Sequence, residues 1–180
     1  CALGVCVKAA CKHVGTAPRR SGKVGTMELQ EILSKGDHTL LAQSAAWEDI
    51  RGICDAGLAY GTASVCIPPS YVARAREYLG DRLAVCTVIG FPNGYATTAA
   101  KCFEAAGAVE DGAEEIDMVI NIGWAKDGRW ENLLQQIRAG RDACGDKILK
   151  GSVETCLLTA AGNIHQCAIA SESGAAQSQP

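Results

Sequence analysis

The chain has 180 residues, of which 48% are apolar and 21% are charged, and its formal net charge is −3. This composition is typical of one globular domain and excludes intrinsic disorder for most of the chain. The acidic balance argues against a nucleic-acid-binding protein. No apolar run approaches the roughly 20 residues of a membrane span, so a membrane partner is not expected either.

Residues 1–26 differ in composition from the rest. They carry five basic residues and no acidic one: Lys8, Lys12, Arg19, Arg20 and Lys23. We interpret them as a basic leader or extension that is unstructured. One alternative is an organellar transit peptide, because such peptides are basic and poor in acidic residues. The other is a metal site formed by Cys1, Cys6 and Cys11.

Ten cysteines are spread over the chain without a C-x-x-C pair. This spacing indicates neither a zinc ribbon nor a thioredoxin-type site. Most of the cysteines lie in apolar surroundings, where a free thiol behaves as a small buried hydrophobe. The sequence therefore predicts a cytoplasmic protein without disulfides. It shows no secretory signal, because the leader lacks a continuous apolar core.

From Met27 onwards, short apolar runs alternate with amphipathic stretches. The expected strands are an early segment near 37–41 and β-branched runs at 63–67, 83–89, 115–122 and 147–153. The expected helices lie between and after them, at 47–60, 70–79, 96–111, 130–144 and 159–173. This alternation predicts an α/β fold with a parallel sheet and right-handed crossovers.

A parallel sheet of this kind can form either a doubly wound open sheet or a closed TIM (β/α)8 barrel. Neither glycine-rich phosphate loop of the doubly wound type occurs in the sequence. Two apolar runs also contain a charged residue, which a barrel interior accommodates near its carboxyl-terminal face. We therefore predict a TIM barrel. It is expected to be incomplete, with five to six βα units in residues 27–174 and a polar, strandless tail at 175–180.

The two charged residues inside apolar runs are Asp117 and Lys150. A buried charge is costly unless it is paired, and adjacent parallel strands would bring these two side chains together. One interpretation is a structural ion pair. The other is a lysine nucleophile that forms a Schiff base with a carbonyl, with the carboxylate moving protons.

Five segments in order resemble the deoxyribose-phosphate aldolase family. They are DHTLL at 37–41, ASVCIPPSYV at 63–72, VIGFPNG at 88–94, EEIDMVIN at 114–121, and ILK at 148–150 with ET at 154–155. The resemblance covers 27 to about 174. It implies a class I aldolase on a TIM barrel, a lyase without metal or cofactor. Such an enzyme reversibly cleaves 2-deoxy-D-ribose 5-phosphate into D-glyceraldehyde 3-phosphate and acetaldehyde, in deoxynucleoside catabolism.

The resemblance also implies roles for individual residues. Lys150 matches the Schiff-base lysine and Asp117 the proton-relay carboxylate. Asp37 and Thr39 match residues near the substrate, and Cys66 matches a pocket cysteine, although a plain core thiol is an equal interpretation of Cys66. The expected partners are a phosphorylated sugar and an aldehyde, and barrels of this kind often form homodimers.

The sequence also departs from the family pattern. Gly151 and Ser152 follow the lysine where the family has aliphatic residues, and Ala42 and Gln43 replace a Lys-Pro pair. The family's second active-site lysine, in a Lys-Thr-Ser-Thr-Gly motif, and its phosphate-binding loops do not occur in residues 1–180. Two further hypotheses therefore stand beside the aldolase: a catalytically inactive truncated fragment of one, and another phosphate-sugar barrel lyase.

Overall fold

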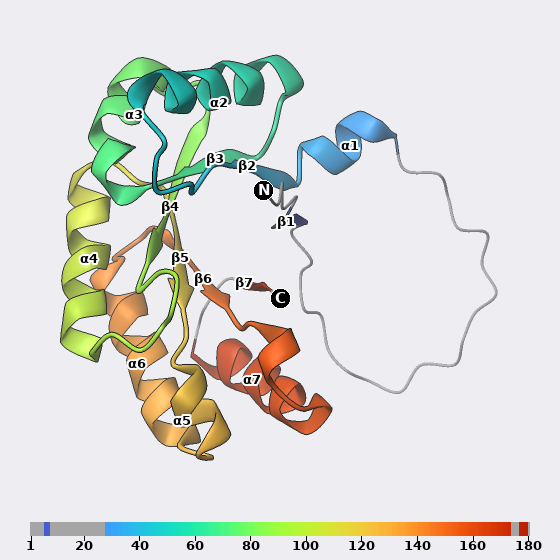
Figure 1. The fold of residues 1–180 in the computed structure, drawn as a ribbon, viewed down its shortest axis with the longest axis vertical. Helices are drawn as coiled ribbons and strands as arrows, with labels where there is room; N and C mark the ends of the chain where they lie inside the picture. The colour runs from blue at the N-terminus through green and yellow to red at the C-terminus, as the bar shows by residue number, and fades with distance from the viewer. Residues whose placement is uncertain (1–5, 8–27, 174–176, 180) are drawn as a thin grey trace.

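The computed structural model describes residues 6–7, 28–173 and 177–179 (Figure 1). The strands form a single sheet whose spatial order follows the chain from β1 to β7. They are β1 (Cys6–Val7), β2 (Gly36–Thr39), β3 (Ser64–Ile67), β4 (Ala84–Ile89), β5 (Glu115–Val119), β6 (Ile148–Ser152) and β7 (Gln177–Gln179). Strands β2 to β7 pair in parallel, and β1 is antiparallel to β2. Such consecutive parallel pairing is typical of a barrel wall.

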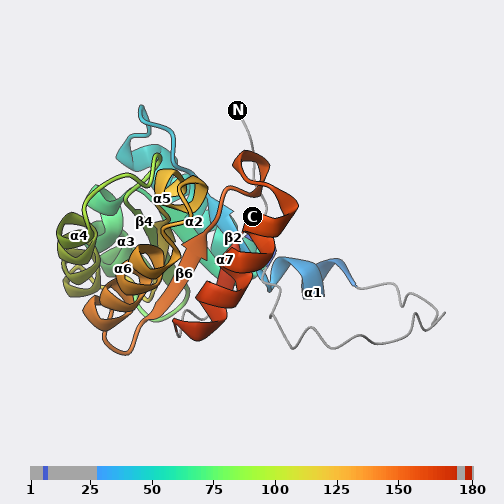
Figure 2. The ribbon, with the colours of Figure 1, turned by 90° about the horizontal axis from the view of Figure 1, so that it is seen from below.

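One short helix precedes β2, and the others connect the parallel strands. The helices are α1 (Leu29–Leu33), α2 (Trp47–Tyr60), α3 (Val72–Leu79), α4 (Thr98–Glu110), α5 (Ile122–Lys126), α6 (Trp130–Ala143) and α7 (Ala160–Glu172), with 3-10 turns η1 (Pro69–Tyr71) and η2 (Thr155–Leu157). Figure 2 shows α3, α4 and α6 together on the outer side of the strands. The predicted alternation of strands and helices is confirmed. None of the described helices is long and apolar enough to cross a bilayer.

The two faces of the sheet have different side chains because successive residues of a strand point to opposite faces. Ile116 and Met118 of β5 and Leu149 of β6 belong to the main apolar core, which also contains residues of the outer helices. The opposite face holds a small cluster of Cys66, Cys86 and Val88. The main apolar core therefore lies outside the sheet, and the inner face combines this small cluster with buried charged side chains.

The predicted strands agree with the observed ones to within one or two residues at each end, except for one that ends early. The run at 115–122 was expected to be extended throughout, but β5 ends at Val119 and α5 begins at Ile122. The side chain of Asn121 accepts a hydrogen bond from the backbone N–H of Trp124, at 3.1 Å. An asparagine in this position caps a helix start, so a local side-chain bond ends the extended run.

The expectation of a strandless tail is wrong, because Gln177–Gln179 pairs with β6 and places Gln177 opposite Lys150. Polar side chains do not prevent backbone groups from forming a ladder. At the other end, Cys6–Val7 pairs with β2, where an unstructured leader was expected. The rest of 1–26 lies outside the described residues. The division at residue 27 stays a prediction.

Two glycines offer a matched test of this packing. A Cβ on Gly151 of β6 would meet no atom within 4 Å, whereas one on Gly57 of α2 would lie 2.7 Å from Leu83 Cδ2 and 2.8 Å from Val65 Cγ1. Gly151→Ala should raise the free energy of unfolding by about 0.5–1 kcal/mol, because it restricts the unfolded chain without a clash. Gly57→Ala should lower it by about 1–2 kcal/mol, since overpacking outweighs the gain in helix propensity. Urea denaturation followed by circular dichroism measures both, and equal effects would contradict the packing described.

Candidate active site

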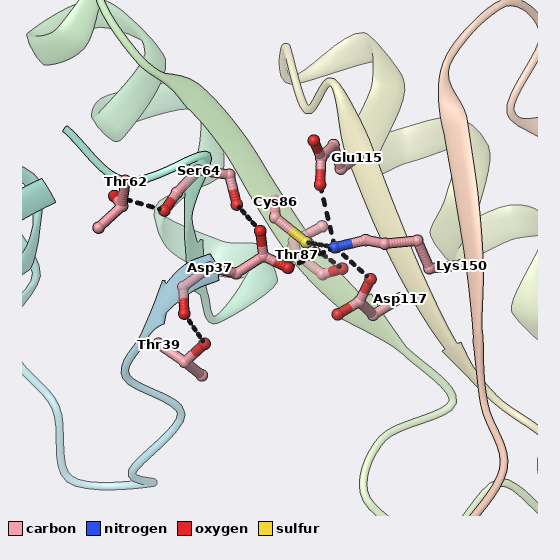
Figure 3. A network of polar contacts seen from close by, with 9 residues as sticks. All are labelled: Asp37, Thr39, Thr62, Ser64, Cys86, Thr87, Glu115, Asp117 and Lys150. Carbon is pink, nitrogen blue, oxygen red and sulfur yellow. Dashed lines mark hydrogen bonds and ion pairs between the residues drawn. The ribbon is translucent and has the colours of Figure 1, made fainter. Parts of the chain in front are cut away.

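A buried cluster of charged side chains occupies the inner face of the sheet (Figure 3). The Nζ atom of Lys150 lies 2.8 Å from Asp37 Oδ2, 2.9 Å from Asp117 Oδ1 and 3.0 Å from Glu115 Oε2. The lysine side chain is completely buried, and the carboxylates are almost so. One ammonium therefore neutralises part of the charge of three carboxylates.

The strand register explains how two neighbouring strands supply most of this cluster. Asp117 on β5 is the direct partner of Lys150 on β6. Glu115 precedes Asp117 by two residues and therefore points to the same face of β5. The predicted meeting of Asp117 and Lys150 is confirmed.

Asp37 reaches the cluster for a different reason. It lies on β2, four strand positions away from β6. In a flat sheet, with strands about 4.8 Å apart, that separation would be roughly 19 Å. The contact of 2.8 Å between Asp37 and Lys150 therefore requires the sheet to curve around a common interior. This curvature is what makes the site.

Hydrogen bonds from β3, from β4 and within β2 support the cluster. Ser64 Oγ on β3 donates to Asp37 Oδ1 at 2.8 Å. Lys150 Nζ also donates to Cys86 Sγ on β4 at 3.3 Å. The hydroxyl of Thr39 donates to the backbone carbonyl of Asp37 at 3.2 Å. Two of these bonds hold Asp37 and one holds Lys150.

The five predicted site residues lie close together. Asp37 and Asp117 each contact Lys150. Thr39 and Cys66 lie in the same row of the sheet as Cys86 and Glu115, between the row of Asp37 and the row of Asp117 and Lys150. Thr39 pairs with Cys66, and Cys66 pairs with Cys86. Cys66 is buried in the small apolar cluster of the inner face.

Two residues of the cluster were not predicted from the sequence, Glu115 and Cys86. The period of two along a strand could have found Glu115, because it shares a face with Asp117. Cys86 carries no such signal, since its apolar sequence neighbours resemble those of any buried core thiol.

The neighbours of Lys150 determine its protonation. Burial by itself lowers the pKa of Lys150, but Cys86 and the carboxylates of Asp117, Asp37 and Glu115 raise it, and the net pKa lies above its usual value. The carboxylates account for this rise, because burial raises the pKa of the Cys86 thiol well above its usual value and leaves it neutral. Lys150 is therefore an ammonium at neutral pH.

Asp117 differs from an ordinary aspartate. Burial raises the pKa of its carboxyl group, the Lys150 ammonium opposes that effect, and the net pKa is above its usual value. A carboxyl group with a raised pKa exchanges a proton more readily near neutral pH. The cluster therefore pairs a buried amine with an acid that can take up its proton.

The same side chains include two sets that could hold a metal ion. The ligand atoms of Cys66, Cys86 and Asp117, and those of Asp37, Cys86 and Glu115, lie within 4.8 Å of one another in each set. The ammonium of Lys150 already contacts Asp37, Glu115, Asp117 and Cys86. A metal ion would have to displace this ammonium, and the expectation of metal-free chemistry stays a prediction.

Residues 31–169 match the family model described as DeoC/LacD family aldolase. The chain belongs to the DeoC/LacD aldolase family. Deoxyribose-phosphate aldolases of Streptococcus pyogenes serotype M28 and Streptococcus agalactiae serotype Ia are each 53% identical to it over 149 residues. Those residues make up 83% of this chain and 67% of each relative. The predicted family is confirmed.

Solved structures of the family agree with the fold. A crystal structure assigned to a deoxyribose-phosphate aldolase from Coccidioides immitis has a TM-score of 0.75 at 44% identity, over 77% of this chain and 55% of that one. A tetrameric deoxyribose phosphate aldolase from Aeropyrum pernix has a TM-score of 0.75 at 23% identity, over 83% and 63%. The predicted partial TIM barrel is confirmed. The chain spans less than two thirds of these solved structures.

Removing the central cation should make stability depend on pH. Lys150→Met leaves three buried carboxylates without their ammonium, which should cost about 3–5 kcal/mol at pH 8. The pKa of Asp117 is already above its unfolded value, so its protonated form favours the folded state. Folded-state stability is then present at low pH and lost as pH rises through that pKa. The loss should be much smaller at pH 5.

Urea titrations of the wild-type protein and of Lys150→Met, each at pH 5 and pH 8, measure how the loss of stability depends on pH. The double variant Lys150→Met with Asp117→Asn should recover part of the stability at pH 8, because it removes one uncompensated charge. A loss that is the same at both pH values, or no recovery in the double variant, would contradict the charge cluster.

Proposed function

We propose that this protein is a deoxyribose-phosphate aldolase, a lyase that reversibly cleaves 2-deoxy-D-ribose 5-phosphate into D-glyceraldehyde 3-phosphate and acetaldehyde. The observation that carries this proposal is the fully buried Lys150, whose Nζ lies 2.9 Å from a carboxyl group of raised pKa, Asp117. The names of the relatives at 53% identity support this substrate over other phosphorylated sugars.

The first step turns the Lys150 ammonium into an amine. A carboxylate of the cluster takes its proton, and Asp117 is suited to this because its raised pKa stabilises the protonated form. The amine then attacks the C1 aldehyde of the open-chain sugar to give a carbinolamine. Loss of water, with the proton returned by the same carboxyl group, yields an iminium on Lys150.

The iminium then accepts the electron pair of the bond that breaks. Asp117 removes the proton of the C3 hydroxyl, directly or through a water molecule, and the C2–C3 bond cleaves. D-Glyceraldehyde 3-phosphate leaves, and the two remaining carbons stay on Lys150 as an enamine. Protonation of the enamine carbon and hydrolysis of the resulting iminium release acetaldehyde and restore the lysine.

The other predicted residues take supporting roles in this proposal. Asp37, held by Ser64, orients the Lys150 amine and faces the substrate. Thr39 supplies a hydroxyl at the carboxyl end of β2, where barrel enzymes bind their substrates. Cys66 forms an apolar wall beside Cys86 and Val88, which also fits its interpretation as a core thiol.

We place this reaction in the cytoplasm, with a phosphorylated sugar and an aldehyde as its partners. Six cysteines of the described part of the chain are free thiols, which suits a reducing compartment. A homodimer stays a prediction.

Borohydride trapping tests the nucleophile. Wild-type protein incubated with acetaldehyde and sodium borohydride should gain one ethyl group on Lys150, seen by peptide mass spectrometry, whereas Lys150→Ala should gain none there and lose turnover. Asp117→Asn should lower kcat by about 10²–10⁴-fold, the usual contribution of a positioned acid–base group. Lys126→Ala, which removes an exposed lysine, should leave both readouts unchanged.

The same experiment separates the alternatives. A wild-type chain that folds cooperatively but forms no adduct and cleaves no sugar would contradict the proposal and favour the inactive fragment. An adduct on Lys150 together with faster cleavage of a different phosphorylated sugar would favour another barrel lyase.

Glu115 should control how easily Lys150 loses its proton. Its carboxylate lies 3.0 Å from Nζ and helps to raise the pKa of Lys150. Glu115→Gln should therefore lower that pKa and raise the rate of borohydride trapping at pH 7 by about tenfold, since one pKa unit is a tenfold change in amine. Glu77→Gln, an exposed change of the same kind, should have no effect. A trapping rate that falls or stays constant in Glu115→Gln would contradict this role.

A further inference from the structure

The protein contains a second completely buried lysine, Lys101 on α4. Its Nζ donates to the carbonyl of Gly94 at 2.6 Å, to the carbonyl of Val119 at 2.7 Å and to Gln136 Oε1 at 2.8 Å. An ammonium has three donors, so these three acceptors satisfy it completely. Unlike Lys150, it forms no ion pair with a carboxylate of the described residues. The proposed reaction does not use it.

The three acceptors belong to three different elements. Gly94 lies in the loop between β4 and α4, Val119 is the last residue of β5, and Gln136 lies on α6. Gln136 also donates from Nε2 to Thr98 Oγ1 at 3.3 Å, which connects it to the start of α4. Lys101 therefore joins the loop, the carboxyl end of β5 and two outer helices through one atom.

The loop sequence fits closely around this lysine. A Cβ on Gly90 would lie 2.7 Å from Lys101 Cε, and one on Gly94 would lie 1.8 Å from the carbonyl oxygen of Ile120. Both glycines also have positive φ angles, +61° and +72°. Glycine adopts this backbone conformation without strain and has no Cβ that would clash at such a close approach. The two glycines of the 90–94 loop thus allow the loop to lie against Lys101 and the end of β5.

The loop also lines a cavity of about 350 Å³. Phe91 and Pro92 form part of its lining, together with Leu41 and Ala42, which follow β2, and Val88 of β4. Val88 belongs to the inner face of the sheet together with Cys86, which contacts Lys150. The cavity therefore opens at the carboxyl ends of β2 to β4, beside the charge cluster.

We propose that Lys101 is a positioning residue that fixes the 90–94 loop as one wall of the substrate cavity. This inference rests on the proposed aldolase function for the identity of the substrate. Burying an ammonium without a carboxylate partner is costly, and a methionine of similar length would fill the same space. What methionine would lack is the three donors that tie Gly94 to Val119. Burial lowers the pKa of Lys101 to about 8, an effect that Glu104 opposes, so the ammonium form still prevails at pH 7.

The test compares Lys101→Met with Lys35→Met, which removes an exposed lysine. In Lys101→Met, the KM for 2-deoxy-D-ribose 5-phosphate should rise about tenfold, while kcat and the borohydride trapping of acetaldehyde on Lys150 should change less than about twofold. The reason is that the cavity wall moves while the charge cluster stays in place. Hydrogen exchange should accelerate at the backbone amides of 90–97 and not at those of β2 and β6. Lys35→Met should change none of these readouts.

Gly94→Ala disturbs the same loop from its other side and leaves Lys101 intact. Its Cβ would collide with Ile120, so it should give the same rise in KM and the same local exchange. If Lys101→Met does not fold, Gly94→Ala tests whether the position of the 90–94 loop controls KM. Equal changes in KM and kcat, or faster exchange over the whole sheet, would overturn the positioning role. A wild-type protein without turnover would refute the proposed function alone, and the exchange pattern would then decide the role of Lys101.

Discussion

The contact between Lys150 and Asp37 is the constraint on which the arrangement of the site depends. These residues lie four strand positions apart, and their side chains meet only because the sheet curves around its inner face. The outer face buries the apolar side chains against the helices, and this burial supplies the main driving force for folding. The inner face can then hold charged groups, whose mutual attraction offsets part of their desolvation. Stability and chemistry are thus divided between the two faces of one sheet.

This division explains which parts of the site the sequence could predict. Asp117 and Lys150 interrupt apolar runs, and parallel pairing of consecutive strands brings them together. Asp37 was identified through its motif, because no local pattern tells how far a sheet curves. Glu115 shares a strand face with Asp117, so the period of two along a strand could have predicted its place in the cluster. Cys86 could not have been predicted in this way, since its role depends on a contact with a side chain 64 positions away.

The fold was predictable to a similar extent. Strand positions followed from short apolar runs, because the central strands β3, β4 and β5 are buried on both faces, and helix positions followed from amphipathic spacing. The end of β5 was not predicted, since the capping hydrogen bond of Asn121 ends the strand although the apolar run continues to Ile122. The pairing of Gln177–Gln179 was not predicted either, because it depends on backbone groups and not on side-chain hydropathy. Gly151 and Ser152, which depart from the family pattern, remain within the β5–β6 ladder.

The two buried lysines show how surroundings assign different chemistry to the same side chain. Lys101 meets carbonyl oxygens, which accept hydrogen bonds but cannot take a proton, so its amine has no base to activate it. Lys150 meets three carboxylates, which raise its pKa and also provide acceptors for its proton. A high pKa alone would oppose nucleophilic attack. The raised pKa of Asp117 removes much of that opposition, because moving the proton from Lys150 to Asp117 reduces two buried charges to none. Activation of Lys150 is then a proton transfer inside the cluster, and its free-energy cost depends on how many carboxylates remain ionised around it.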